Sequence, residues 1–348
     1  MTALTMPARP AEDTSLRPLP WRRMAWVTWR QHRFALTGVA ALLGALAVYV
    51  WIVGLQMHHA YAAATACHPV SSPACGELFI SANQMNPVLA NGFPLLAVPA
   101  LIGMFVGAPV LARELETGTF RYAWTQGFGR WRWTLAKLVM LAVAVAAATG
   151  AVSVLLSWYY QPYFAARNPA MSFSELSPLT QGLFPLRGIA FAAWTLAAFA
   201  IGALAGMLIR RVVPAMAATL AAYIGLGYAA AVFLREHYLT LVVTDKLNTP
   251  VAAWITSQWF TKGGKFAFAA NGVPAFNLFQ RLCPPYAVGS KPPIGPEVCL
   301  AQHGYTLWTS YQPASRFWPF QWIEGGWLLA LSVLLIAATI WLVRRRAA

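Results

Sequence analysis

Six stretches of this sequence are apolar over the length that a helix needs to cross a lipid bilayer. An α-helix rises about 1.5 Å per residue and the hydrocarbon layer is about 30 Å thick, so about 20 apolar residues are enough. The stretches cover residues 34–57, 88–111, 135–158, 188–209, 213–234 and 327–343. The sequence therefore predicts an all-α integral membrane protein with six transmembrane helices, five of them within residues 34–234.

The composition supports this interpretation and argues against a nucleic-acid partner. Hydrophobic residues make up 59% of the chain and charged residues 10%, whereas about 25% of residues are charged in a typical soluble domain. The formal net charge is +15, but the basic residues lie beside the ends of the apolar stretches. This distribution is typical of membrane topology.

The basic residues also predict the orientation of the chain, because Lys and Arg near the ends of membrane spans are retained in the cytoplasm. One side of the predicted membrane carries most of them: Arg9, Arg17, Arg22, Arg23, Arg30, Arg33, Arg113, Arg121, Arg130, Arg132, Lys137, Arg210, Arg211, Arg344, Arg345 and Arg346. Residues 1–20 contain no apolar core, so they are predicted to be a disordered tail and not a cleaved signal peptide. We expect a multi-pass protein of the plasma (cytoplasmic) membrane with both termini in the cytoplasm.

Residues 21–33 are amphipathic when they are placed on a helical wheel. One side of the wheel carries the arginines Arg22, Arg23, Arg30 and Arg33, with Trp26 among them. The opposite side carries Trp21 and Trp29. This pattern predicts an interfacial helix at the inner membrane surface. The alternative is that the segment is only the anchoring flank of the first transmembrane helix.

All four cysteines fall in predicted external loops. The simplest pairing joins Cys67 to Cys75 and Cys283 to Cys299, since disulfides persist in oxidising compartments. Four free buried thiols are the alternative. A metal site formed by Cys283, Cys299 and His303 is disfavoured because the spacing matches no paired zinc knuckle, and no metal is predicted.

The last external connection, residues 235–325, is long enough to form an external loop domain, because structureless loops of that length are uncommon. It mixes aromatic residues with prolines, which suggests short helices folded over the outer mouth of the membrane domain. Residues 250–260 are interpreted as a re-entrant or surface helix that is too short to span the membrane. Residues 326–348 would form the sixth helix and a basic cytoplasmic tail.

The motifs of ATP hydrolysis and of common catalysis are not recognised in the chain. The fragment at residues 263–266, Gly-Gly-Lys-Phe, lacks the glycine spacing and the hydroxyl of a phosphate-binding loop. His58, His59 and His68 have no nucleophile at a diagnostic spacing. The acidic residues lie outside the six stretches, with Glu324 at the edge of the last, so ion-coupled transport has no obvious carrier. We do not expect the chain to be an enzyme by itself.

Two helices carry small residues at a spacing that lets helices approach closely. These are Gly103-x-x-x-Gly107 and Gly202-x-x-x-Gly206, and both packing within one subunit and dimerisation are compatible with them. The second helix also contains prolines that bend it and free backbone carbonyls. Asn91 lies nearby. Together with Pro94 and Pro99, it makes this helix a candidate lining of a translocation path.

The connection between the second and third helices is the most suggestive stretch. Glu114 and Glu116 are expected to end the second helix in water, Gly118 permits a turn, and Thr119 caps a short helix within residues 119–127. Phe120, Ala123 and Trp124 would share one face of that helix, with Arg121 on another. Arg130 to Lys137 then form a basic and aromatic belt.

These features resemble a type-2 ABC exporter permease of the ABCG-like type V fold. The resemblance rests on the six-helix topology, on the Glu-x-Gly-Thr element at residues 116–119, and on Arg130 and Lys137. It implies a coupling helix at 119–127 seated in a separate ATPase, with Glu114 and Glu116 as transmission elements and residues 21–33 as connecting helix. It further implies two permease copies, as a homodimer or pseudo-dimer, and two ATPase subunits that carry ATP and magnesium.

The leading hypothesis is therefore the membrane subunit of an ATP-driven exporter that works by alternating access. An apolar, aromatic interior favours a hydrophobic or amphipathic cargo such as a drug, lipid or peptide. The alternatives are an ATP-independent transporter or channel, and a non-transporting membrane sensor or assembly protein.

Overall fold

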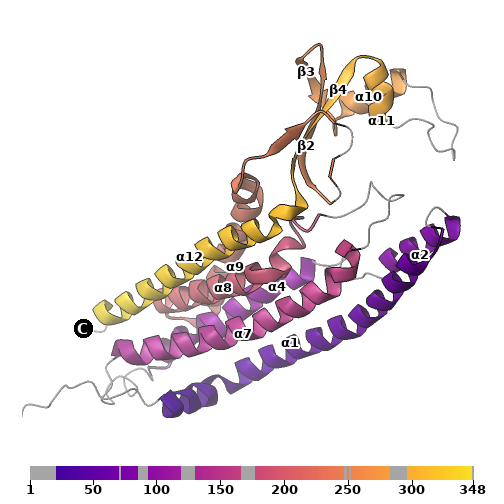
Figure 1. Cartoon of the computed structure of the whole chain (residues 1–348). Coiled ribbons are helices and arrows are strands. Elements are labelled where there is room, and N and C mark those ends of the chain that lie inside the picture. Colours follow the sequence, from indigo (N-terminus) through magenta and orange to yellow (C-terminus); the bar gives the residue numbers. More distant parts are fainter. Residues whose placement is uncertain are drawn as a thin grey trace, which may run out of the picture.

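A computed structural model describes residues 21–69, 72–84, 93–118, 130–165, 177–246, 249–250, 252–282 and 296–346. The described part is mainly helical, and six of its helices are long and apolar enough to cross a membrane. Figure 1 shows them as a bundle with an antiparallel sheet at one end. We call this the sheet end, and the opposite end, where α1 begins and α12 finishes, the terminal end. The predicted six-helix membrane architecture is confirmed.

The first and third membrane helices are single long rods. Helix α1 covers Trp21–Ala66 and α7 covers Arg130–Ala165. Because α1 is continuous, the amphipathic segment 21–33 is its first turns and not a separate helix. The helix α2, Pro73–Gln84, folds back against α1, and the predicted disulfide Cys67–Cys75 joins the two.

The second membrane helix is built from three segments. They are α4, Phe93–Ile102; the π-helix η1, Gly103–Gly107; and α5, Ala108–Glu116. Pro99 lies buried inside α4. Short π-helical segments are rare within α-helices and often mark functional positions. The structure extends this helix to Glu116, five residues past the predicted end at 111.

The remaining membrane helices follow the predicted order with changed boundaries. Helix α8 covers Gly188–Ile209, and α9 covers Val212–Ala229 and continues through the π-helix η4, Ala230–Leu234, and the 3-10 helix η5, Arg235–His237. Helix α12 covers Phe317–Arg346. It therefore begins ten residues before the predicted start at 327, so the predicted boundary at residue 325 lies inside a helix.

The connection before α12 contains a sheet where we predicted short helices. Its strands are β1 (Val242–Thr244), β2 (Trp254–Lys262), β3 (Lys265–Ala269) and β4 (Tyr305–Gln312), in the order β1-β4-β2-β3 with every pair antiparallel. Two short helices accompany it, α10 (Val273–Leu282) and α11 (Pro296–Gln302). The predicted helix at 250–260 is wrong, because β2 occupies most of it.

Local sequence explains this strand. Residues 254–262 are rich in aromatic and β-branched side chains, which favour a pleated strand. Gly263 and Gly264 follow at once with φ values of +57° and +79°, which is the backbone of a two-residue hairpin turn. Trp259 pairs with Ala269 across the hairpin and with Trp308 on the other side. The Gly-Gly pair is therefore a turn signal.

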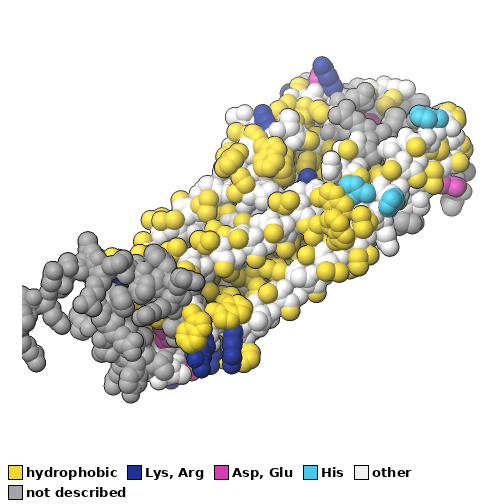
Figure 2. Space-filling model, turned by 60° about the horizontal axis from the view of Figure 1, so that its bottom comes forward, with side chains coloured by type: hydrophobic (Ala, Val, Ile, Leu, Met, Phe, Trp, Pro, Cys, Tyr) yellow, Lys and Arg dark blue, Asp and Glu magenta, His cyan; other side chains and the backbone are white. Residues whose placement is uncertain are grey.

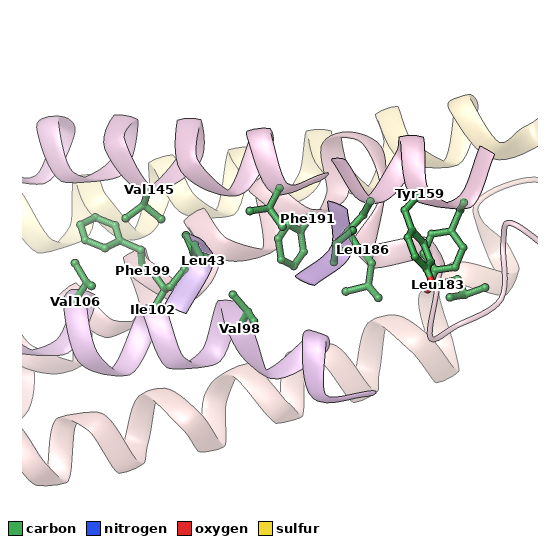
Figure 3. Close-up of a cluster of buried hydrophobic side chains, with 14 of the residues drawn as sticks. Leu43, Val98, Ile102, Val106, Val145, Tyr159, Leu183, Leu186, Phe191 and Phe199 are labelled. Carbon is green, nitrogen blue, oxygen red and sulfur yellow. The ribbon is translucent and has the colours of Figure 1, made fainter. Parts of the chain in front are cut away.

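Helix α8 lies at the centre of the bundle and packs against α4, η1, α5, α7, α9 and α12. Figure 3 shows hydrophobic side chains meeting between the helices, among them Val98 and Ile102 of α4, Val145 of α7, and Phe191 and Phe199 of α8. The outward faces of α1, α9 and α12 are largely exposed, and hydrophobic side chains cover the middle of the bundle in Figure 2. This is the surface that a bilayer would cover.

The two glycine motifs pack against each other within this chain. A Cβ atom on Gly202 would lie 2.4 Å from the carbonyl oxygen of Gly103, and one on Gly206 would lie 2.4 Å from that of Ala108. A Cβ atom on Gly107 would lie 2.6 Å from the carbonyl oxygen of Phe199. Only glycine permits so close an approach of two backbones. The motifs therefore serve an internal contact between the second and fourth membrane helices.

Candidate functional site

A buried ion pair joins the helix before residues 119–129 to the helix after them. The Lys137 ammonium on α7 lies 2.7 Å from Oε1 of Glu114 on α5 and donates a second hydrogen bond, 3.2 Å long, to the Val110 carbonyl oxygen. The side chain of Lys137 is 1% exposed and that of Glu114 13%. A charge buried to this extent is stable only with a close counterion. The contact therefore joins α5 to α7.

Glu116 forms a second tie, two residues further along α5. Its Oε2 atom accepts a hydrogen bond of 3.0 Å from the backbone N–H of Val212, the first residue of α9. A carboxylate at this place satisfies an unpaired N–H group and interacts favourably with the positive end of the helix dipole. Glu114 and Glu116 thus connect one helix end to two different helices. We call these two contacts the terminal-end anchor.

The chain leaves α5 just after this anchor. Thr117 caps the helix, with its backbone N–H and its hydroxyl both donating to the Arg113 carbonyl oxygen. Gly118 follows with a φ of +70°, a left-handed conformation that glycine adopts without strain. The predicted turn at Gly118 is confirmed. Thr119, Phe120, Arg121 and Trp124 lie outside the described residues, so the coupling helix stays a prediction.

Arginine and tryptophan side chains surround this end of the bundle. Guanidinium groups lie over tryptophan rings in several pairs at 4.3–5.8 Å: Arg30 over Trp26, Arg132 and Arg344 over Trp131, and Arg345 over Trp341. Trp29 is also exposed. Figure 2 shows Lys and Arg beside hydrophobic side chains at this end. Such pairs are typical of a membrane–water interface. The side chains of Trp21, Arg22 and Arg23 lie outside the described residues.

A second buried ion pair lies at the sheet end, and the sequence did not predict it. Both carboxylate oxygens of Glu324 on α12 accept hydrogen bonds from Arg235, at 2.9 and 3.0 Å. Trp194 of α8 donates to the same carboxylate at 2.7 Å and Tyr238 at 3.2 Å. Burial and the neighbouring carboxylate raise the pKa of Tyr238, so its phenol keeps the proton that it donates.

This cluster, the Glu324 cluster, connects three parts of the chain. Glu324 is 0% exposed and Arg235 2%, although we had placed Glu324 at the edge of the last apolar stretch. The sequence contained one signal for this ion pair. Glu324 is a carboxylate within the apolar run of residues 317–343, and a charge buried in such a run requires a partner. Nearby Gln321 accepts from the Ala190 N–H and donates to the Phe184 carbonyl oxygen, which adds a further tie between α12 and the start of α8.

The other predicted site residues that the structure describes do not join either cluster. Pro94 is the second residue of α4 and Pro99 is buried within the helix, whereas Asn91 lies outside the described residues. Cys299 is disulfide-bonded, but its predicted partner Cys283 is not described, so that pairing stays a prediction. Among the described residues no group of three or more His, Cys, Asp and Glu side chains is suited to hold a metal ion.

Six helices that are long and apolar enough to cross a membrane define a multi-pass membrane protein. A family model described as "ABC-2 membrane transporter related" matches residues 40–235. This range covers more than half of the chain, which therefore belongs to that family and is a membrane permease of the ABC type. Permeases of this family normally pair with an ABC ATPase. No curated protein and no solved structure gives a significant match.

Proposed function

We propose that this chain is the transport subunit of an ATP-driven exporter and that separate ATPase subunits supply the energy. The single observation that carries the proposal is the terminal-end anchor. It joins both helices that flank residues 119–129 through Glu114 and Lys137, and it reaches α9 through Glu116. A partner that moves residues 119–129 would thereby move several membrane helices together.

The packing around the anchor gives such a movement a route into the bundle. Helix α5 continues through η1 into α4, and this whole unit lies against the glycines of α8. Contacts between backbones transmit displacement with little loss, because no flexible side chain intervenes. A shift at Glu114 would therefore reach the middle of the membrane, where α4 and α8 meet. Alternating access requires a displacement of this kind.

The side of the membrane follows from charge. The described basic side chains at the terminal end lie over tryptophan rings at the same end of the bundle as the anchor, and short segments rich in Lys and Arg stay in the cytoplasm. In this proposal the anchor therefore faces the cytoplasm of the plasma membrane, where an ATPase would meet it. Two copies of the permease, or two related chains, would bind two ATPase subunits, and the cargo would be hydrophobic or amphipathic.

The test is reconstitution of the chain with its ATPase in liposomes. Lys137→Met should leave the complex assembled but lower cargo-stimulated ATP hydrolysis and efflux by about tenfold, which corresponds to an ordinary coupling free energy. Phe120→Glu with Trp124→Glu should weaken binding of the ATPase itself. Gly225→Ala is the matched control, because a Cβ atom at that position meets no neighbour within 4 Å.

Two outcomes would overturn the proposal. One is full cargo-stimulated hydrolysis in the Lys137 variant, and the other is efflux driven by an ion gradient with no ATPase present. The buried Glu324 is an acidic group of the kind that an ion-coupled transporter needs. Its carboxylate, however, already accepts four hydrogen bonds from Arg235, Trp194 and Tyr238, and this favours a structural role.

A further inference from the structure

Arg187 is a partly buried cation that has no acidic partner among the described residues. It lies at the start of α8, where the chain leaves the 3-10 helix η3, Phe184–Leu186. Its Nε and Nη1 atoms are buried and have no hydrogen-bond partner in the described part of the chain. The two ion pairs found among the described residues belong to Lys137 and Arg235. Burial lowers the pKa of Arg187 to about 10, opposed by Tyr160, so the group stays charged at neutral pH.

Aromatic rings surround the guanidinium group. Its central carbon lies 4.5 Å from the ring centre of Phe164, 5.1 Å from that of Phe317 and 5.9 Å from that of Tyr160. These rings come from α7 and α12. They stabilise a cation through their faces, but they offer no acceptor to its N–H groups. Leaving buried N–H groups unpaired is unfavourable, because they have lost their hydrogen bonds to water without a replacement.

Tyr160 supplies a second unpaired donor at the same place. Its side chain is 0% exposed, and no described residue forms a hydrogen bond with its buried hydroxyl. A phenol can donate, and a guanidinium group can only donate. Arg187 and Tyr160 therefore lack the same kind of partner, which is an acceptor, and a negatively charged acceptor would also balance the arginine.

Arg235 shows what such a partner looks like in this protein. Its guanidinium group lies 4.8 Å from the ring centre of Phe184, and Phe184 in turn contacts Phe317 edge to face at 5.9 Å. The two arginines thus lie against one aromatic cluster. Arg235 has the Glu324 carboxylate as its counterion, whereas Arg187 has no described carboxylate and is more exposed.

The position near a helix end at the bundle surface also suits an anion. Arg187 is the N-cap residue of α8, so the positive end of the helix dipole adds to its charge. Trp318 contacts Phe317 and is 56% exposed. An apolar chain attached to the anion would therefore find exposed aromatic surface beside the charged group.

We propose that Arg187 and Tyr160 bind the oxyanion head group of an amphipathic molecule, a phosphate or carboxylate at the end of an apolar chain. The oxygens would accept from Nε and Nη1 of Arg187 and from the Tyr160 hydroxyl. Phe164 and Phe317 would exclude water from these bonds. The site does not depend on the proposed transport function, and both a membrane phospholipid and an amphipathic cargo have this chemistry.

The experiment measures binding to the purified, delipidated full chain in a non-ionic detergent, with no ATPase present. Dodecyl phosphate should raise the melting temperature in a saturable manner. Tyr160→Phe should weaken this binding by about tenfold, as expected for one lost hydrogen bond to a charged group, and Arg187→Gln should weaken it further. Arg281→Gln, an exposed basic residue on α10, is the control and should bind as the unaltered chain does.

Further probes separate the sources of the head group. Stabilisation by phosphatidylglycerol but not by phosphatidylcholine in nanodiscs supports a membrane lipid, whereas equal stabilisation by dodecanoate and dodecyl phosphate only in detergent supports a cargo. Binding of inorganic phosphate as strong as that of dodecyl phosphate overturns the role of the apolar chain. Unchanged dodecyl phosphate binding in folded Arg187 and Tyr160 variants overturns the site itself.

The variants should also be informative without ligand. If the two side chains await a partner, Tyr160→Phe removes only an unsatisfied hydroxyl and should melt no lower than the unaltered chain. If their role is internal packing alone, both variants should lose stability and dodecyl phosphate should protect none of the proteins. That pattern would also overturn the proposal.

Discussion

The two buried ion pairs of this protein have similar chemistry and different surroundings. Glu324 at the sheet end is completely enclosed and accepts four hydrogen bonds from three side chains. Glu114 at the terminal end is 13% exposed and has Lys137 as its ion-pair partner. A charge with many fixed donors resists displacement, whereas a pair that water can reach can separate at lower cost. The comparison suggests a rigid sheet end and a terminal end that can move.

The largest effect is expected at the rigid end. Glu324→Gln would leave Arg235 charged and buried without an anion, which should lower the free energy of unfolding by about 3–5 kcal/mol. Thermal unfolding of the purified protein would measure it. Combining Glu324→Gln with Arg235→Met removes both charges and keeps an acceptor for Trp194. The double variant should therefore recover most of the stability that Glu324→Gln loses. If Glu324→Gln alone were as stable as the unaltered chain, the Glu324 cluster would not be what stabilises the sheet end.

The same experiment at the terminal end should give a smaller loss. Lys137→Met leaves Glu114 facing water, and the missing hydrogen bonds to a charged group account for about 1–3 kcal/mol. The variant should fold and insert in the membrane, with its main defect in coupled ATP hydrolysis. If Lys137→Met proved more destabilising than Glu324→Gln, the assignment of rigid and movable ends would be reversed.

A third variant tests the contact between the two ends. In Gly202→Ala the added Cβ atom would lie 2.4 Å from the Gly103 carbonyl oxygen and 2.7 Å from the Ala108 N–H nitrogen. Because both neighbours are backbone atoms, the helices must separate, at a cost of about 1–3 kcal/mol. Gly225→Ala, in open space on α9, should be neutral or stabilising by up to about 1 kcal/mol. Equal melting temperatures for the two variants would argue against the close contact.

The sequence predicted those parts of the fold that depend on short-range patterns. Apolar length was enough for the six membrane helices, and local cysteine spacing was enough for Cys67–Cys75. The sheet was missed because its strands pair residues far apart, such as Trp254 with Gln312. Two local signals were present: the aromatic and β-branched side chains of residues 254–262, and the turn at Gly263 and Gly264. We had weighed the Gly-Gly pair only against a phosphate-binding loop.

The candidate sites likewise depend on contacts between residues far apart in the sequence, which local patterns do not reveal. The sequence predicts that Glu114 and Glu116 end the second helix in water, whereas in the structure both carboxylates contact other helices. Their predicted role in coupling stays a prediction. Their partners, Lys137 and the N–H group of Val212, lie 23 and 96 residues away. Spacing along the chain contains no information on such contacts. Likewise, nothing local indicates that Glu324 meets Arg235.

The smallest effect on stability is expected at Glu116, and it distinguishes holding the fold from transmitting movement. Glu116→Gln keeps an acceptor for the Val212 N–H group and loses only the interaction of a charge with the α9 dipole, which is about 0.3–1 kcal/mol at an exposed site. The melting temperature should hardly change.

Coupled ATP hydrolysis in the reconstituted complex should respond more strongly to the same substitution, because the movable end then loses part of its connection to α9. Glu116→Ala removes the acceptor altogether. It should reduce coupled ATP hydrolysis further, with a melting temperature similar to that of Glu116→Gln. If both variants couple normally, α9 does not take part in transmission, and the route into the bundle runs through Glu114, Lys137 and the glycine contact with α8.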